Sequence, residues 1–208
     1  IGTLSGMLFG LEGCAGDLLD TSPSYSFSSS NVWTSPILAR AAVMGVYNEL
    51  YEKFSKNYDS PSIGIPFDAW SSVMDIDMNW KNNCFVISGS CTPSNGNVGN
   101  HYKYYYTVVY RANDVINNID NVPEMDDSEK ARLKAECKFL RAWAYYHLNV
   151  LWRGVPIYME NVESSEATKA RSSEAEVWEQ VLSDLTDCIN AVSYTHLRAH
   201  ETLRHLVC

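Results

Sequence analysis

The residues best suited to chemistry gather between residues 57 and 100, in a long stretch rich in Ser, Asn, Gly and Pro. This stretch places Trp80 among short polar side chains, those of Asp75, Asp77, Asn79, Asn82 and Asn83. An aromatic ring can stack on the CH face of a sugar, and Asp and Asn can hydrogen-bond to its hydroxyls. These residue types therefore suit a carbohydrate-binding loop. Alternatively, Trp80 packs the loop onto helices and the Asn side chains serve turns.

No pattern in the sequence predicts an enzyme. It has no nucleophile elbow, no HExxH motif and no phosphate-binding glycine loop. Asp75 and Asp77 could imitate the paired carboxylates of a glycosidase, but two residues on one loop guarantee no fixed separation. Together with Asn79 they also resemble the start of an EF-hand loop, which would need Gly where Trp80 stands. We therefore expect no catalytic residue, no metal and no cofactor, and interpret His147 as an ordinary helical side chain.

The two ends of the sequence differ in character from its middle. Residues 1–13 are apolar and small, with one charge at Glu12, which is typical of a truncated signal peptide. They lead into Leu11-Glu12-Gly13-Cys14, which is similar to a bacterial lipobox, although Glu12 stands where a small neutral residue is usual. We expect Cys14 to be lipidated, with a buried free thiol as the alternative. The polar residues 21–31 would then form a tether.

Residues 193–208 hold three of the five His residues, at 196, 200 and 205. Their near-helical spacing could form a metal site. The composition changes abruptly at Ser193, however, and the segment resembles translated adapter-like sequence. We expect a non-native tail here and no metal site.

The remaining residues, 14–192, are long enough to form one domain of ordinary size. The chain of 208 residues has 46% hydrophobic and 20% charged residues, enough to bury a core. Its net charge of −9 argues against binding to nucleic acid. The six Cys residues match no zinc pattern. Cys84 and Cys91 could pair or stay free, whereas Cys137 and Cys188 are expected in the core.

Four segments show the 3.6-residue period of a helix, namely residues 35–54, residues 102–121, residues 126–153 and a segment that begins at Ser173. A short turn joins the second and third, which predicts an αα-hairpin, the unit of helical repeat proteins. Asp126 and Ser173 are the expected N-caps, each with Glu three residues later. The expected apolar stripes include Phe139, Tyr146 and Val150 on the third helix, and Val177, Val181, Leu182 and Ile189 on the fourth. The fold class is therefore all-α.

Three motifs carry a resemblance to a known family. AECKFLRAWAYYHLNVLWRGVPI, residues 135–157, supplies Glu136, Phe139, Leu140, Arg141, Ala142, Tyr145, Gly154, Val155 and Pro156, with Cys137 in place of the usual Ala. Upstream, YRANDVINNID contributes Arg111, Ala112, Asn113 and Ile116, and CAGDLLDTSP begins at Cys14. In this order the motifs resemble the SusD/RagB family of Bacteroidetes outer-membrane lipoproteins.

That resemblance implies tetratricopeptide-like helix pairs with a long aromatic and polar loop insertion. It also implies a protein that is anchored by a lipid to the bacterial outer membrane and exposed at the cell surface. Such a protein captures an oligosaccharide and delivers it to a SusC-like, TonB-dependent transporter. The chain would be the N-terminal portion of a longer protein, and the loop between the first two helices would supply part of the glycan platform. The ligand contacts that the resemblance implies are Asp77, Trp80 and Asn83. Arg111, Asn113, Glu136 and Arg141 are expected to be structural.

Two other functions remain open at this point. A helical-repeat adaptor lipoprotein that binds peptides or proteins would also be acidic, helical and rich in aromatic residues. A weaker possibility is a fragment of a cell-surface glycosidase. The sequence does not decide whether the ligand is a glycan or a peptide.

Overall fold

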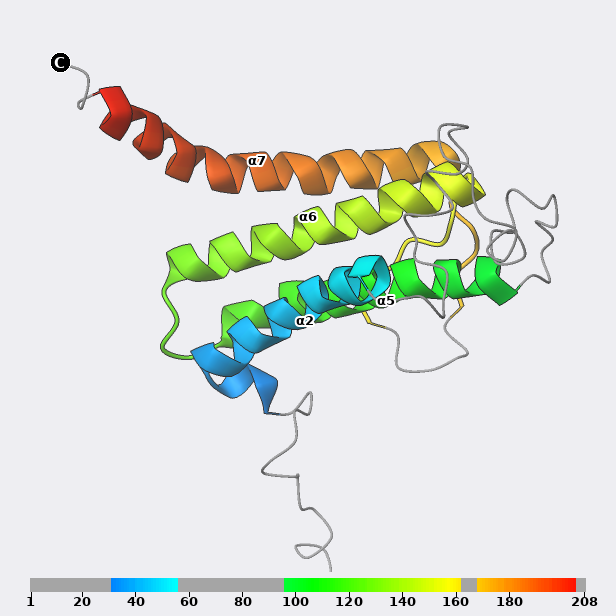
Figure 1. Ribbon diagram of the computed structural model, residues 1–208, viewed down its shortest axis with the longest axis horizontal. Coiled ribbons are helices and arrows are strands. Elements are labelled where there is room, and N and C mark those ends of the chain that lie inside the picture. The colour runs from blue at the N-terminus through cyan, green and yellow to red at the C-terminus, as the bar shows by residue number, and fades with distance from the viewer. Residues whose placement is uncertain (1–30, 56–95, 162–167, 205–208) are drawn as a thin grey trace, which may run out of the picture.

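The computed structural model describes residues 31–55, 96–161 and 168–204 (Figure 1). Its elements are the short 3-10 helix η1 (Val32–Thr34), α2 (Pro36–Ser55), α5 (Gly96–Asn118), η2 (Ile119–Asn121), α6 (Asp127–Trp152) and α7 (Glu174–Arg204). No strand occurs within these ranges. The predicted all-α class is confirmed.

The long helices pack side by side (Figure 1). α5 and α6 form an antiparallel hairpin across the turn at residues 122–126, and α7 runs antiparallel to α6 on its other side. α2 packs against α5 and also meets α6, where Arg40 pairs with Glu129 at 2.7 Å and Tyr47 donates to Glu136 at 3.3 Å. The predicted helical hairpin is therefore present, and α6 is the central helix, with contacts to each of the other three.

Two helix starts differ from the prediction. α5 begins at Gly96 instead of Tyr102, so the end of the predicted loop is helical. Gly and Asn are poor helix formers, which is why composition indicated a loop there. At α6, Asp126 has the extended backbone of an N-cap, but its side chain makes no capping bond. Its expected partner Glu129 instead binds Arg40 of α2.

The start of α7 is as predicted. The backbone N–H of Ser173 donates to Glu176 Oε2 at 2.7 Å, and the N–H of Glu176 donates to Ser173 Oγ at 3.3 Å. These reciprocal bonds form a capping box, which satisfies donors that a helix start leaves open. The bonds from Ser173 lower the pKa of the Glu176 carboxyl.

α6 ends at Trp152 and is followed by a left-handed turn at Arg153 and the predicted Gly154. Arg153 has φ 54° and Gly154 has φ 87°. A Cβ on Gly154 would lie 2.6 Å from the carbonyl oxygen of Ser172, so this close approach requires glycine. Arg171 donates to the carbonyls of Trp152, Arg153 and Gly154 and so satisfies acceptors that the helix end leaves open.

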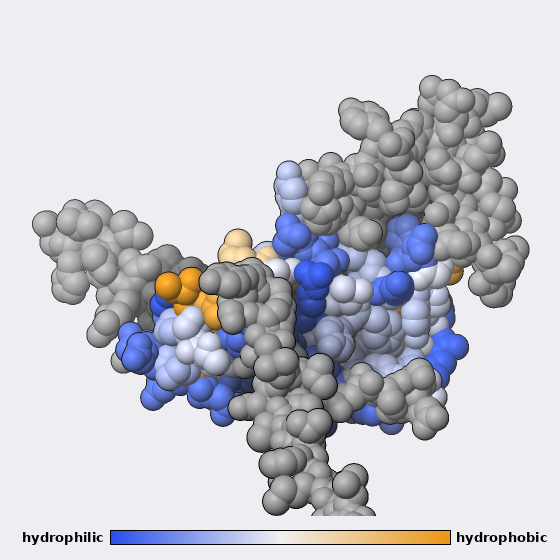
Figure 2. Space-filling view, turned by 90° about the horizontal axis from the view of Figure 1, so that it is seen from below, coloured by the Kyte–Doolittle hydropathy of each residue, from blue (hydrophilic) through white to orange (hydrophobic). Residues whose placement is uncertain are grey.

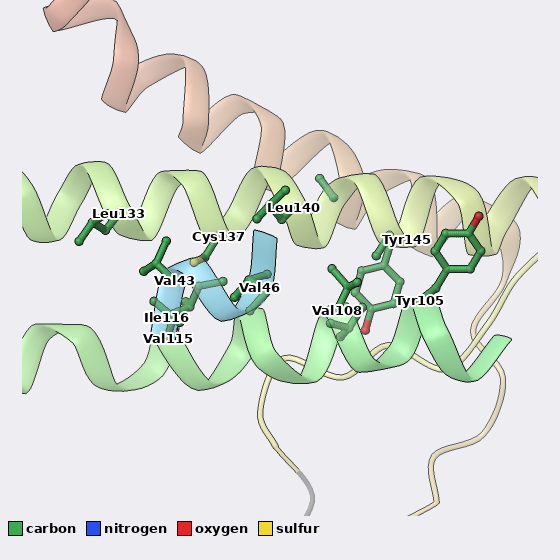
Figure 3. Close-up of a cluster of buried hydrophobic side chains, with 14 of the residues drawn as sticks. Val43, Val46, Tyr105, Val108, Val115, Ile116, Leu133, Cys137, Leu140 and Tyr145 are labelled. Carbon is green, nitrogen blue, oxygen red and sulfur yellow. The ribbon is translucent and has the colours of Figure 1, made fainter. Parts of the chain in front are cut away.

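The hydrophobic core lies between α5 and α6 and is completed by α2 and α7 (Figure 3). Cys137 and Cys188 are buried free thiols, as expected. Part of the predicted helix stripes is wrong: the five side chains Phe139, Tyr146, Val150, Leu182 and Ile189 are exposed. On α6 the core uses another side, with Leu140, Ala144 and Leu148. On α7, Val177 and Val181 are buried as predicted.

Across the described ranges, none of the helices combines the length and apolar character that crossing a membrane requires. Seen from below, the surface is mainly hydrophilic, with a small hydrophobic patch near one end (Figure 2).

Candidate functional site

The residues predicted to contact ligand, Asp77, Trp80 and Asn83, lie outside the described residues, as do Cys14, Cys84 and Cys91. Their geometry therefore remains a prediction. The chain segment that carries Trp80 rejoins the helices at Gly96, the start of α5. That end of the bundle also holds the C-terminal half of α6 and the start of α7 (Figure 1).

An aromatic cluster occupies this end of the bundle. Its members come from three helices and are Tyr102, Tyr105 and Tyr106 of α5, Trp143, Tyr146, His147 and Trp152 of α6, and Trp178 of α7. The rings of Tyr105 and His147 stack with centroids 5.3 Å apart, and Tyr102 meets Trp152 at 5.2 Å. Tyr105 is fully buried, whereas most of the other rings are partly exposed.

The cluster offers partly exposed ring faces, the kind of surface on which the CH face of a sugar can stack. Burial lowers the pKa of His147, so this imidazole is neutral near pH 7 and can donate and accept hydrogen bonds. The hydroxyls of Tyr104 and Tyr105 are buried and have no hydrogen-bond partner among the residues that the structure describes. Among the described residues, no group of three His, Cys, Asp or Glu side chains could hold a metal ion.

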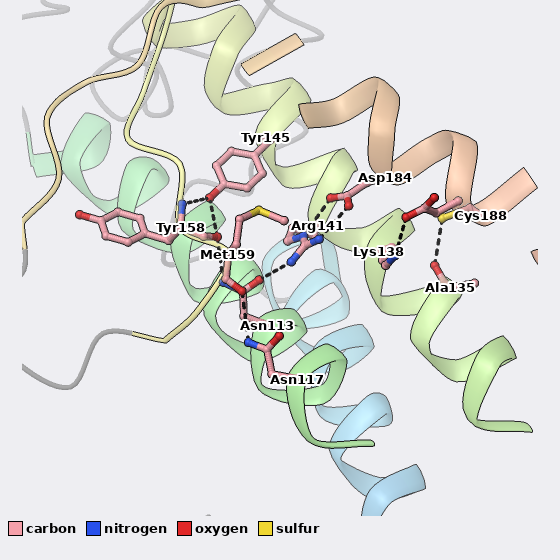
Figure 4. Close-up of polar contacts among 11 residues, drawn as sticks. Asn113, Asn117, Ala135, Lys138, Arg141, Tyr145, Tyr158, Met159, Asp184 and Cys188 are labelled. Atoms are coloured by element: carbon pink, nitrogen blue, oxygen red, sulfur yellow. Dashed lines mark hydrogen bonds and ion pairs between the residues drawn. The ribbon is translucent and has the colours of Figure 1, made fainter. Parts of the chain in front are cut away.

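A buried polar network links α5, α6 and α7 and holds them in register (Figure 4). Arg141 of α6 donates from Nε to Asp184 Oδ2 at 2.8 Å and from Nη2 to Oδ1 at 2.7 Å. Its Nη1 donates to Asn113 Oδ1 on α5 at 2.7 Å. Because the guanidinium bridges α5 and α7 from the central helix, the expected structural role of Asn113 and Arg141 is confirmed.

The same network fixes the segment that follows α6. Asn113 Nδ2 donates to the carbonyl of Tyr158 at 2.9 Å, and Asn117 donates to that of Met159 at 3.1 Å. The backbone N–H of Tyr158 donates to Tyr145 Oη at 2.7 Å, and that hydroxyl donates back to the Tyr158 carbonyl at 3.0 Å. The extended segment is thereby held against α5 and α6 (Figure 4).

The other two residues expected to be structural also join helices. Arg111 of α5 donates to the carbonyl of Gly45 at 2.9 Å and pairs with Glu49 of α2 at 2.8 Å. Glu136 of α6 accepts from Tyr47 of α2 and pairs with Arg132.

Sequence reasoning did not single out Asp184 as the partner of Arg141. A usable signal was present, because Asp184 falls in helical phase with the buried Val177, Val181 and Cys188. A carboxylate on an apolar stripe needs a buried cation or donors.

Comparison with known proteins places this arrangement in a family. Residues 17–204 match the SusD-like family described as "Starch-binding associating with outer membrane". The chain therefore belongs to the SusD-like family, and the resemblance drawn from its motifs is confirmed.

Curated relatives agree over most of the chain. It is 26% identical to SusD-like protein P25 of Formosa agariphila in an alignment of 187 residues that covers 86% of this chain and 35% of that protein. It is 25% identical to a SusD-like protein of Bacteroides ovatus in an alignment of 183 residues that covers 86% of this chain and 32% of the relative. The chain thus spans about a third of the length of these relatives.

Solved structures show the same fold. A laminarin-binding SusD-like protein superimposes with a TM-score of 0.65 at 24% identity, covering 76% of this chain and 34% of the other. A SusD-like carbohydrate-binding protein from Bacteroides vulgatus gives a TM-score of 0.61 at 22% identity, covering 76% of this chain and 36% of the other.

Proposed function

We propose that the full-length protein is a cell-surface lipoprotein that captures an oligosaccharide and delivers it to a TonB-dependent outer-membrane transporter. The family match over residues 17–204 carries this proposal, because the family is described by starch binding and by association with the outer membrane. The laminarin-binding relative, which shares the fold, supports a glycan as the ligand.

The proposed glycan contacts are Trp80, which would stack on a sugar ring, and Asp77 and Asn83, which would bond its hydroxyls. Two observations support this choice. The residue types suit a sugar, and their segment rejoins the helices at Gly96, the end of the bundle that carries the aromatic cluster. The polar network around Arg141 would keep this end rigid, because a binding surface works best on a fixed scaffold.

The proposed anchor is an acyl group on Cys14, with residues 21–31 as the tether to the helices. Metabolic labelling with a fatty acid would mark the full-length protein and leave a Cys14→Ser variant unlabelled. Equal labelling of both proteins would refute the anchor. Protease shaving of intact cells would then report whether the anchored protein faces outward.

We propose a binding protein and not an enzyme. Incubation of the full-length protein with each glycan that it binds should release no reducing sugar. Sugar release that persists after further purification would support the glycosidase alternative instead.

The function as a whole is tested with the purified full-length protein in native gels that contain a panel of polysaccharides, with starch and laminarin included. At least one polysaccharide should retard its migration, while an unrelated acidic protein runs unchanged. If no glycan retards the protein and a peptide library binds it, the adaptor function replaces the present proposal.

A second experiment tests delivery to the transporter. Affinity purification of the tagged full-length protein from detergent-solubilised membranes should also recover a large outer-membrane transporter. Recovery of the protein without a transporter would refute the delivery step.

A further inference from the structure

Residues 155–159, which we call the strap, are bound to the helices mainly through their backbone. Four consecutive carbonyls accept a hydrogen bond from a side chain, and the donors to Pro156, Ile157, Tyr158 and Met159 are, in that order, Tyr106 at 2.7 Å, Lys169 at 3.2 Å, Asn113 at 2.9 Å and Asn117 at 3.1 Å. Among the described residues, only one backbone–backbone bond reaches the strap, from the N–H of Ser172 to the carbonyl of Val155 at 3.3 Å. Side chains of the helices therefore take the place of a neighbouring strand.

Three of these donors form one row on α5. Tyr106, Asn113 and Asn117 have the spacing i, i+7 and i+11, which places them along one side of the helix. Tyr145 of α6 adds a hydroxyl that accepts from the N–H of Tyr158 at 2.7 Å (Figure 4). We call these four residues the donor row. Hydroxyl and amide groups that bond main-chain carbonyls recognise a feature that every peptide has, so the donor row has the chemistry of a peptide-binding site.

One side chain of the strap adds its own contacts. The ring of Tyr158 meets that of Tyr106, with centroids 5.9 Å apart. Its hydroxyl accepts from the backbone N–H of Lys169 at 3.1 Å, and the Lys169 ammonium lies 5.4 Å from the ring centroid. Tyr158 is therefore the side-chain anchor of the strap.

The chain holds both ends of the strap close to the donor row. The strap leaves α6 through the left-handed turn at Arg153 and Gly154. Arg171, beyond its other end, donates to the carbonyls of these same two residues. A segment tethered in this way acts at an effective concentration on the order of millimolar or more, so a free peptide at lower concentration competes poorly with it.

We propose that the donor row is a peptide-binding site that the chain fills with its own strap, and that this intramolecular contact closes the α5–α6 pair to other peptides. Neighbouring helices of repeat proteins commonly offer such surfaces to ligands, and here the surface is already occupied. The proposal does not depend on glycan binding, because it concerns a different ligand class and a different set of residues.

Fluorescence polarisation with the labelled peptide GVPIYMEN, the sequence of residues 154–161, tests the proposal on the full-length protein. The parent should not bind this peptide, because the strap occupies the donor row. A strap variant with Ile157→Gly and Tyr158→Gly loses the anchor ring and gains backbone freedom, so it should bind the peptide at least about tenfold more tightly than the parent. Circular dichroism checks that the variant is folded. Equal affinities of the parent and the folded variant, or no binding by either, would overturn the proposal.

A further substitution in the strap variant shows where the peptide binds. Asn117→Ala removes one donor of the row and should weaken peptide binding about fivefold. Asn118→Ala is the matched control, because this neighbouring amide bonds Asp114 within α5 and should leave the affinity unchanged. Equal effects of the two substitutions would place the peptide elsewhere and overturn the proposal.

Hydrogen exchange of the unsubstituted full-length protein tests the occupied site even where the strap variant does not fold. The amide of Tyr158 donates to Tyr145, so it should exchange at least about a hundredfold more slowly than the same amide in the free peptide. Exchange at the rate of the free peptide would overturn the proposal, because the donor row would then be open to other peptides.

Discussion

Arg141 and Asp184 form a two-pronged ion pair between α6 and α7, with the two side chains only 2% and 3% exposed. Both carboxylate oxygens accept from the guanidinium, at 2.7 and 2.8 Å, and the remaining arm reaches Asn113 on α5. A single buried cation thereby links three helices. Such a pair gains little over apolar packing, but breaking one half of it leaves a buried charge without a partner.

The first prediction concerns this pair. Arg141→Met should lower the free energy of unfolding by about 3–5 kcal/mol, because Asp184 is then buried and uncompensated. The double variant Arg141→Met with Asp184→Leu should recover most of that loss. Urea unfolding of the two variants and the parent measures both effects. A double variant no more stable than the single one would contradict the pairing.

A second prediction concerns the turn that ends α6. Gly154→Ala should destabilise the protein by about 1–3 kcal/mol, because φ is 87° and the new Cβ would meet the Ser172 carbonyl oxygen at 2.6 Å. Gly99→Ala is the matched control. The Cβ that this substitution adds would have nothing within 4 Å, and Ala is a better helix former than Gly. That variant should gain about 0.5–1 kcal/mol in thermal unfolding. Equal effects at the two positions would refute the geometry of the turn.

The third prediction concerns thiol reactivity. Burial raises the pKa of Cys137 to about 12, so the reactive thiolate is scarce at mildly alkaline pH. A thiol reagent such as iodoacetamide should leave Cys137 unmodified in the native protein and alkylate it once guanidinium unfolds the chain. Peptide mass spectrometry locates the modified residue. Rapid alkylation of Cys137 under native conditions would show that it is not in the core.

A fourth prediction concerns pH. Burial lowers the pKa of His147 below its value in the unfolded chain, so the stability that its neutral form contributes is present above about pH 6.5. This contribution is lost as the pH falls through the folded-state pKa. His147→Phe keeps a ring against Tyr105 and removes the titration, so its unfolding free energy should fall less between about pH 7 and pH 5. An unchanged pH dependence would exclude His147 as a contributor.

The fold could be predicted in large part from local patterns. Helical periodicity located the four long helices of the described residues, and the Ser173–Glu176 pair located the start of α7, because these signals depend on neighbouring residues alone. The expected cap bond of Asp126 is absent, and Glu129, its expected partner, instead contacts Arg40, which is distant in sequence. Local reasoning could not foresee that contact.

The candidate site could be predicted less well. Residue types indicated a sugar-binding loop around Trp80, but the aromatic cluster depends on which sides of α5, α6 and α7 meet. Periodicity shows that Phe139 and Leu182 lie on apolar stripes. It does not show which part of a stripe faces the core. On α6 the core lies on another side, with Leu140 and Leu148, and on α7 the predicted Val181 is buried whereas the predicted Leu182 is exposed.

The most direct test of the proposed function is the dissociation constant of the full-length protein for a glycan that retards it in gels, measured by isothermal titration calorimetry. Trp80→Ala should weaken binding about 5- to 150-fold, since a stacked aromatic ring contributes on the order of 1–3 kcal/mol. Tyr110→Ala, which removes an exposed aromatic side chain of α5, should bind like the parent. A Trp80→Ala protein that binds with the affinity of the parent would contradict the proposed glycan platform.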